Sequence, residues 1–235
     1  RDMIDRIGVL DDKLLWSCQL RTEISKDRDL VAKMRDAGCC MVYIGFESIN
    51  PEALKQMHKG QNVDDIRRSI RVFKETGIGV HGMFMFGTDA DQLDCFKTTS
   101  DFCRASGLTT VQYLALTPLP GTRFYRQIEA EGRLLHKDWQ HYDAMHVVFR
   151  PKHMTPLQLQ EGLISCFSDF YCYLSAFNEA LTVAFDTLGT LFRKLYTKAY
   201  FPSIFGVLFK FFGKRIVRSW IGHNQTYLDY LRNLG

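Results

Sequence analysis

Short apolar runs alternate along the chain with longer segments in which apolar residues recur at helical spacing. The runs are Leu14–Arg21, Met41–Glu47, Val80–Gly87 and Thr110–Leu116. This alternation is typical of repeated βα units, in which parallel strands form a sheet and the helices pack outside it. The pattern therefore predicts an α/β fold built on a parallel sheet.

Turn-forming residues mark both ends of most of the predicted helices. Asn50 is placed to cap the helix after the second strand, with Pro51 at its first position. Asp89 with Gln92 has the form of a capping box after the third strand. Glycines between a helical pattern and the next strand predict left-handed C-terminal caps, and they are Gly38, Gly77 and Gly107.

The pattern changes after Gly121. One more helix is predicted through Glu131, then a loop rich in aromatic residues and histidine, and then a short strand at Val147–Phe149. Thr155 and Gln158 form a second predicted capping box, and only helices are predicted beyond it. We therefore divide the chain into an α/β part, residues 1–150, and a helical C-terminal region, residues 151–235.

The composition is that of an ordinary globular protein. The 235 residues are 46% hydrophobic and 24% charged, as in ordinary globular proteins. No apolar run reaches the roughly 18 residues that a membrane span needs, and no N-terminal segment resembles a signal peptide. The seven cysteines include no C-x-x-C pair, which favours reduced thiols. We expect a cytoplasmic protein.

The net charge of +4 arises in the helical C-terminal region. Residues 1–150 carry 21 basic and 21 acidic side chains, whereas residues 151–235 carry 9 and 5. Aromatic residues there form one apolar helix face, which predicts docking on the α/β part, with a helix at a membrane surface as the alternative. They do not line a basic groove, so no nucleic-acid partner is expected. The residues are Phe201, Phe205, Phe209, Phe211 and Phe212, with Lys210, Lys214, Arg215 and Arg218.

Unusual residues stand where the predicted strands end, which is where parallel βα folds carry their active sites. The second strand ends in Glu47 and Ser48, and the carboxylate either accepts hydrogen bonds from a ligand, caps a helix or pairs with a lysine. The third strand contains Gly82 and Gly87, which either admit a flat ligand or simply turn the chain. The fourth runs into a stiff loop with two prolines, residues 117–122.

A histidine-rich loop is a second candidate for chemistry. His136, His141 and His146 lie near Asp138 and Asp143, a combination of side chains that metals bind. No helical or strand spacing directs these side chains at a common point, so we expect them to face solvent and to bind no metal.

Taken in order, a series of short motifs resembles the radical S-adenosylmethionine (radical SAM) proteins that carry an N-terminal cobalamin-binding domain. The resemblance covers about residues 1–175. Its specificity lies in the order of the motifs, since each alone is weak. They are W-S-x-Q-x-R from Trp16, A-G-C from Ala37, G-F-E-S-I-N-P-E from Gly45, G-M-F-x-F-G-T-D from Gly82, L-T-P-L-P-G-T from Leu116, E-G-R from Glu131, D-W-x-x-Y-D from Asp138 and F-R-P-K-x-M-T from Phe149.

The resemblance implies a partial barrel of six βα units, of which the chain would hold the last four, and a small-molecule substrate. It implies that Glu47 and Ser48 face the methionine or ribose part of S-adenosylmethionine. It assigns the adenine side to two further sets of residues, Gly82, Phe84 and Gly87 on the third strand and Leu116, Thr117 and Pro118 after the fourth.

One departure from the family pattern concerns the 4Fe-4S cluster. The family holds it with a C-x3-C-x2-C motif, and no cysteines of this chain have that spacing. We therefore expect the chain to be the C-terminal portion of an enzyme that cleaves S-adenosylmethionine reductively or transfers a methyl group from cobalamin, and to be inactive alone. The alternative is a non-catalytic α/β module that binds a nucleotide-like ligand or a partner. A truncated barrel also predicts an unpaired edge at Leu14–Arg21 and a wetter inner face than a closed core has.

Overall fold

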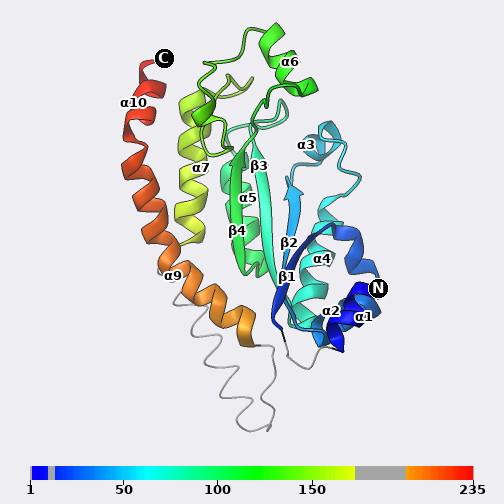
Figure 1. Cartoon of the computed structure of the whole chain (residues 1–235). Helices are drawn as coiled ribbons and strands as arrows, with labels where there is room; N and C mark the ends of the chain where they lie inside the picture. Colours follow the sequence, from blue (N-terminus) through cyan, green and yellow to red (C-terminus); the bar gives the residue numbers. More distant parts are fainter. Residues whose placement is uncertain (1, 10–13, 173–199, 235) are drawn as a thin grey trace.

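The computed structural model describes residues 2–9, 14–172 and 200–234, and for residues 200–211 the backbone alone. A parallel sheet of four strands, ordered β1-β2-β3-β4, forms the centre of the molecule (Figure 1). The strands are β1 Trp16–Leu20, β2 Cys39–Glu47, β3 Gly79–Phe86 and β4 Thr110–Ala115. All four predicted strands and their parallel pairing are thus confirmed.

Helices pack against one face of this sheet, and α5 lies behind it in Figure 1. Those that connect successive strands are amphipathic, so each buries its apolar side against the strands. The helical elements are α1 Asp2–Gly8, η1 Thr22–Lys26, α2 Arg28–Asp36, α3 Pro51–Gln56, α4 Val63–Thr76, α5 Cys95–Ser106, α6 Arg123–Ala130, η2 Trp139–His141, α7 Pro156–Phe170, α9 Tyr200–His223 and α10 Gln225–Asn233.

The two faces of the sheet differ because side chains alternate along a strand. On the helix-covered face, Phe84 is fully buried, with ring centroids 5.7 Å from Phe46, 6.3 Å from Phe102 and 6.1 Å from Tyr113. The opposite face, which we call the inner face, is half-buried or exposed. Its residues are Ser17, Gln19, Tyr43, Gly45, Glu47, His81, Met83, Met85, Gln112 and Leu114. The expected wetter inner face is therefore present.

Most of the predicted helix ends are confirmed. Asn50 accepts a hydrogen bond from the Glu52 amide with Pro51 at the first helical position, and Thr155 forms a capping box with Gln158. The three predicted glycine caps have left-handed φ angles, +97° at Gly38, +80° at Gly77 and +76° at Gly107.

The capping box predicted at Asp89 and Gln92 is wrong. Helix α5 begins at Cys95 after Asp94, and the side chain of Asp94 makes no capping hydrogen bond. The Asp89 carboxylate instead pairs with Arg133, at 3.0 Å, and with Lys152, at 2.6 Å. Both cations come from later segments of the chain, so the Asp89 carboxylate forms tertiary ion pairs and does not cap a helix.

The two edges of the sheet are finished differently. Within the described residues β1 pairs with β2 alone, so the predicted open edge is confirmed. The edge of β4 is covered: the Tyr171 hydroxyl lies 2.9 Å from Val111 N and 2.6 Å from Val111 O, and the Ala115 amide donates to Ala144 O. A covered edge cannot recruit another strand, whereas the outer edge of β1 has no strand partner in the part of the chain that the structure describes.

Helices α7, α9 and α10 form the described part of the predicted helical C-terminal region. The strand predicted at Val147–Phe149 is reduced to an antiparallel bridge between Leu134 and Phe149. None of the described helices has the length and apolar character required to cross a membrane. Most of the predicted apolar aromatic face, namely Phe201, Phe205, Phe209 and Phe211, has side chains outside the described residues, whereas Phe212 is 55% exposed.

Candidate functional site

The C-terminal ends of β2, β3 and β4 lie on one edge of the sheet because all the strands run parallel. Glu47 ends β2, Ser48 follows it, and Gly87 and Pro118 come after β3 and β4, so these residues stand at one edge of the sheet, as predicted; we call it the site edge. Two hydrogen bonds join the segments there: Asn50 Nδ2 donates to Ala90 O at 3.1 Å, and the Leu116 amide donates to Phe86 O at 2.8 Å. The site edge is thus a continuous surface built from three strand ends.

Glu47 ends β2 in a strained conformation. Its φ of +63° is left-handed, which for a residue other than glycine costs on the order of 1 kcal/mol or more. The pairing of β2 with β3 shifts register between Gly45 and Glu47. The carboxylate is 17% exposed and pairs with Lys59 at 2.8 Å, the lysine pairing we considered for it from the sequence. The carboxylate lies over Gly45, where a Cβ would be 2.6 Å from Glu47 Oε1, and its charge is paired with that of Lys59.

Gln61 holds the end of β2 in place. Its Nε2 donates to Phe46 O at 2.9 Å and to Gly45 O at 3.3 Å, and its Oε1 accepts from Thr22 Oγ1. Thr22 lies two residues after the end of β1, so this amide links the segments that follow β1 and end β2. The sequence analysis did not identify Gln61, because no neighbouring residue indicates that its side-chain amide contacts β2.

The Ser48 hydroxyl has a local partner. Ser48 is 7% exposed, and its Oγ accepts a hydrogen bond from the Asn50 amide at 3.0 Å. This bond shapes the turn that leads into α3, and the hydroxyl still has a proton to donate.

The turn after β3 is organised by a buried carboxylate. Asp91 is 2% exposed, and its Oδ2 accepts from the amides of Gly87 and Thr88, both at 2.9 Å. Burial raises the pKa of Asp91, although these hydrogen bonds act in the opposite direction. Gly87 has a φ of +103°, and a Cβ there would lie 2.9 Å from Leu159 Cδ2, so this turn requires glycine.

Gly82 and Phe84 lie on the helix-covered face of β3. A Cβ at Gly82 would lie 3.2 Å from Phe46 Cδ2, and Phe84 belongs to the same buried aromatic group. Their predicted contact with a ligand stays a prediction, and the geometry gives both a packing role. On β3 the inner face is formed by His81, Met83 and Met85.

A row of polar groups crosses the inner face below the site edge. The His81 ring lies 4.8 Å from the Tyr43 ring, and its Nδ1 lies 2.7 Å from Thr110 Oγ1. Burial lowers the pKa of His81 to about 4, against the effect of a Gln112 hydrogen bond, so the imidazole is neutral near pH 7. Tyr43, His81 and Gln112 were missed from the sequence, although their alternation with buried residues was a usable signal.

The segment after β4 completes the site edge. Leu116 and Thr117 are half-buried and Pro118 is buried. Thr117 Oγ1 donates to Ala115 O at 3.0 Å, which occupies the hydroxyl proton and leaves its lone pairs as acceptors. The Leu116–Pro118 segment is therefore a stiff edge with few free polar groups.

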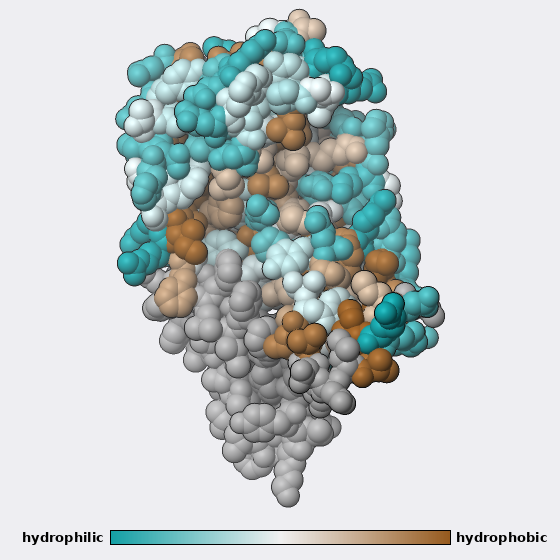
Figure 2. Space-filling view, in the orientation of Figure 1, coloured by the Kyte–Doolittle hydropathy of each residue, from teal (hydrophilic) through white to brown (hydrophobic). Residues whose placement is uncertain are grey.

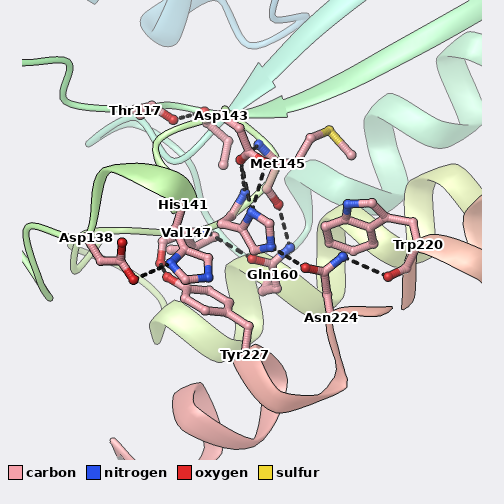
Figure 3. A network of polar contacts seen from close by, with 12 residues as sticks. Thr117, Asp138, His141, Asp143, Met145, Val147, Gln160, Trp220, Asn224 and Tyr227 are labelled. Carbon is pink, nitrogen blue, oxygen red and sulfur yellow. Dashed lines mark hydrogen bonds and ion pairs between the residues drawn. The ribbon is translucent and has the colours of Figure 1, made fainter. Parts of the chain in front are cut away.

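The prediction that the loop histidines face solvent is wrong. Figure 3 shows His141 and its neighbours gathered around Tyr227 and Asn224 of the C-terminal helices. His146 is 6% exposed, His141 stacks on Tyr227 at 4.5 Å, and His136 Nε2 lies 2.9 Å from the Tyr227 hydroxyl. The residue on which the three histidines meet is Tyr227 of α10, more than 70 residues later in the chain, so the local sequence could not predict the contact.

The described cysteines do not suit a 4Fe-4S cluster. The described residues contain no group of three or more His, Cys, Asp or Glu side chains placed to hold a metal. Cys39 begins β2, at the opposite end of the strand from Glu47, and Cys103 and Cys166 are buried in helices. Burial raises the pKa of Cys103 to about 12, which keeps the thiol protonated and a poor ligand. We therefore derive no step through a cluster held by these residues.

Known proteins share sequence with this chain. The radical SAM superfamily model matches residues 13–103. Bacteriochlorophyllide d C-12(1)-methyltransferase of Chlorobaculum tepidum is 31% identical over 157 residues, which cover 66% of this chain and 34% of that enzyme. The C-8(2)-methyltransferase of the same organism is 25% identical over 162 residues, covering 68% of this chain and 36% of the enzyme. The chain thus spans about a third of the length of these relatives.

A solved structure agrees with the fold of the whole described chain. The cobalamin-dependent S-adenosylmethionine radical enzyme OxsB, solved with aqua-cobalamin and S-adenosylmethionine bound, superimposes with a TM-score of 0.53. The match covers 99% of this chain and 36% of OxsB at 14% identity, so it shows the fold alone. The match of residues 13–103 to the radical SAM model identifies a radical SAM domain in this chain, and the parallel sheet and the order of the motifs agree with it.

Proposed function

We propose that the chain forms the C-terminal part of the barrel of a cobalamin-dependent radical SAM enzyme that methylates a small molecule. The support is that both relatives described above are methyltransferases. The chain spans only about a third of either, so the reaction belongs to a longer assembly in which other residues supply the cluster ligands. When bound, the cluster and cobalamin supply the electron and methyl chemistry, and this chain positions the reactants.

The single observation that carries the proposal is the geometry of Glu47. Its backbone is strained, and its largely buried carboxylate lies beside Gly45 at the end of β2, where it pairs with Lys59. Strain of this kind persists where the surrounding structure enforces it, and such residues cluster at ligand sites. We propose that Glu47 and Ser48 accept and donate hydrogen bonds to the ribose or methionine part of S-adenosylmethionine.

The adenine is proposed to lie between the ends of β3 and β4. Gly87, Leu116, Thr117 and Pro118 form that part of the site edge. Met85 is the residue on the inner face nearest to Gly87 along β3, and a polarisable thioether suits the face of a flat base. Gly82 and Phe84 are then proposed to support this wall from the helix side.

The inner face narrows the choice of substrate. Below Glu47, its described residues carry no formal charge near pH 7: Ser17, Gln19, Tyr43, His81, Met83, Met85, Gln112 and Leu114. Burying an ionic group against such a face would cost several kcal/mol without a counter-ion, by order of magnitude. We propose that the part of the substrate that enters the barrel is uncharged, with an apolar body and a hydrogen-bonding group.

The test requires the protein with its neighbouring sequence. We would express the gene together with its upstream coding sequence, reconstitute it anaerobically with iron and sulfide, and follow the conversion of S-adenosylmethionine to S-adenosylhomocysteine and 5′-deoxyadenosine. Glu47→Gln should lower kcat/KM about 10- to 100-fold, the size expected for a lost charged hydrogen bond. Glu52→Gln, an exposed carboxylate on α3, is the matched control and should have no effect.

The alternative is a non-catalytic module that binds a nucleotide-like ligand or a partner. An upstream sequence without a C-x3-C-x2-C motif, together with no turnover of S-adenosylmethionine, would decide for this alternative. Contact of the basic C-terminal helices with a membrane surface stays a prediction.

A further inference from the structure

A polar network connects the junction of α9 and α10 to the site edge (Figure 3). Asn224, at the junction, donates from Nδ2 to Trp220 O at 2.8 Å, which fixes the orientation of its amide. Its Oδ1 therefore faces His146 Nε2, at 2.6 Å. The Asn224 side chain thus connects the junction to the loop that carries His136, His141 and His146, which we call the histidine loop.

His146 carries the connection into the loop. Its Nδ1 lies 3.0 Å from both carboxylate oxygens of Asp143. Both ring nitrogens consequently face acceptor oxygens, Nδ1 those of Asp143 and Nε2 that of Asn224. Asp143 Oδ1 also accepts from the amides of Met145 and His146, at 2.8 and 3.0 Å, so the carboxylate organises the turn.

The turn held in this way is strained and adjoins β4. Ala144, between Asp143 and Met145, has a φ of +63°, unfavourable for any residue with a Cβ. Its carbonyl accepts the Ala115 amide at 2.8 Å. Ala115 is the last residue of β4, and Leu116, Thr117 and Pro118 follow it directly. The strained carbonyl therefore sets where the Leu116–Pro118 segment leaves the sheet.

A second set of contacts clamps the same loop from two helices. Gln160 of α7 is fully buried, accepts from the Val147 amide and donates to Met145 O, each at 2.9 Å. Tyr227 of α10 donates to Val147 O at 2.8 Å and faces His136 Nε2. His136 Nδ1 accepts from the Asp138 amide, so its Nε2 carries the proton, in agreement with the lowered pKa that burial gives His136. The loop is thus held as one body with the C-terminal helices.

We propose that Asn224 and His146 are positioning residues for the Leu116–Pro118 segment, so that docking of the C-terminal helices holds one wall of the ligand site. This role in ligand binding rests on the proposed function. The physical linkage does not, because it exists whether or not a ligand binds. Through this linkage, the junction of α9 and α10 influences the site edge, although the two are far apart in the sequence.

Amide hydrogen exchange on the full chain tests the linkage without any ligand. Asn224→Ala and His146→Phe should each raise the exchange rate of the Ala115 amide by about tenfold, as loss of one buried hydrogen bond predicts. Asn224→Asp keeps an acceptor for His146 and should restore most of the protection. Thr226→Ala, an exposed substitution on α10, should leave it unchanged.

The Val42 amide in the middle of β2 separates a local effect from global destabilisation. The proposal requires that exchange at Val42 stays near its wild-type rate while Ala115 becomes faster. It is overturned if Ala115 is unchanged in both Asn224→Ala and His146→Phe, or if Val42 and Ala115 accelerate by the same factor. Since no S-adenosylmethionine is present, failure here leaves the proposed function untouched, and failure of that function leaves this result standing.

Discussion

The hydroxyl of Tyr171 both accepts from the Val111 amide, at 2.9 Å, and donates to the Val111 carbonyl, at 2.6 Å. One side chain from the end of α7 thereby takes the place of a neighbouring strand at the edge of β4. The hydroxyl is buried, and burial raises the pKa of Tyr171 above its ordinary value. The helical C-terminal region thus finishes the sheet that the α/β part leaves open.

Tyr171→Phe should therefore destabilise the protein. The substitution keeps the ring and leaves a buried amide and carbonyl without partners, at a cost of roughly 1–3 kcal/mol. Urea unfolding followed by circular dichroism gives the free energy of unfolding. Tyr230→Phe is the matched control, because the Tyr230 hydroxyl makes no hydrogen bond within the described residues, and it should change that free energy much less. Equal losses in the two variants would show that the edge contact contributes little.

The open edge of β1 should make the isolated chain prone to aggregation. Trp16–Leu20 contains no proline, glycine or charge that would discourage pairing with another strand. Gln19→Lys places a charge on this strand and should slow the growth of light scattering several-fold on warming. Gln127→Lys adds the same charge to the exposed surface of α6 and should have little effect. If both lysines slow aggregation equally, net charge and not the edge is responsible.

His81 should make stability fall in acid. Its folded-state pKa is lowered by burial to about 4 from an ordinary value of 6.5, so between these values the unfolded chain binds more protons than the folded one. The free energy of unfolding should then drop as pH falls from about 6.5 to about 4, by at most roughly 3 kcal/mol. His81→Gln cannot titrate, so the difference between the two proteins isolates this contribution. A difference that is flat over the same range would contradict the burial of a neutral His81.

The chain alone should not retain a 4Fe-4S cluster. Its described cysteines form no group of three placed to hold a metal, and burial raises the pKa of Cys103 to about 12, which opposes the thiolate form that iron binds. After anaerobic reconstitution and desalting, iron analysis and the visible spectrum should show no stoichiometric cluster. Recovery of about four irons per chain would contradict this expectation.

The sequence indicated which residues stand at the strand ends, but it did not indicate which face of a strand each residue occupies. The parallel βα pattern was enough to bring Glu47, Gly87 and Pro118 to one edge, because parallel strands all end on the same side. The assignment of Gly82 and Phe84 to the ligand came from motif resemblance, which does not specify the face. The alternation of buried and half-buried residues along β3 decides that question, and it turns Phe84 toward α5.

The sequence by itself determined the elements whose causes are local. Asn50 with Pro51, the glycine caps and the period-two strands act through hydrogen bonds and φ angles within a few residues, so their outcome was predictable. Only the tertiary structure decided where polar groups from distant segments meet. Asp89 pairs with Arg133 and Lys152 instead of capping α5, and the loop histidines collect around Tyr227 and Asn224 instead of facing water. Burial makes an unpaired polar group costly, so such groups take whichever partner the packed fold brings near, and that partner is not written in the adjacent sequence.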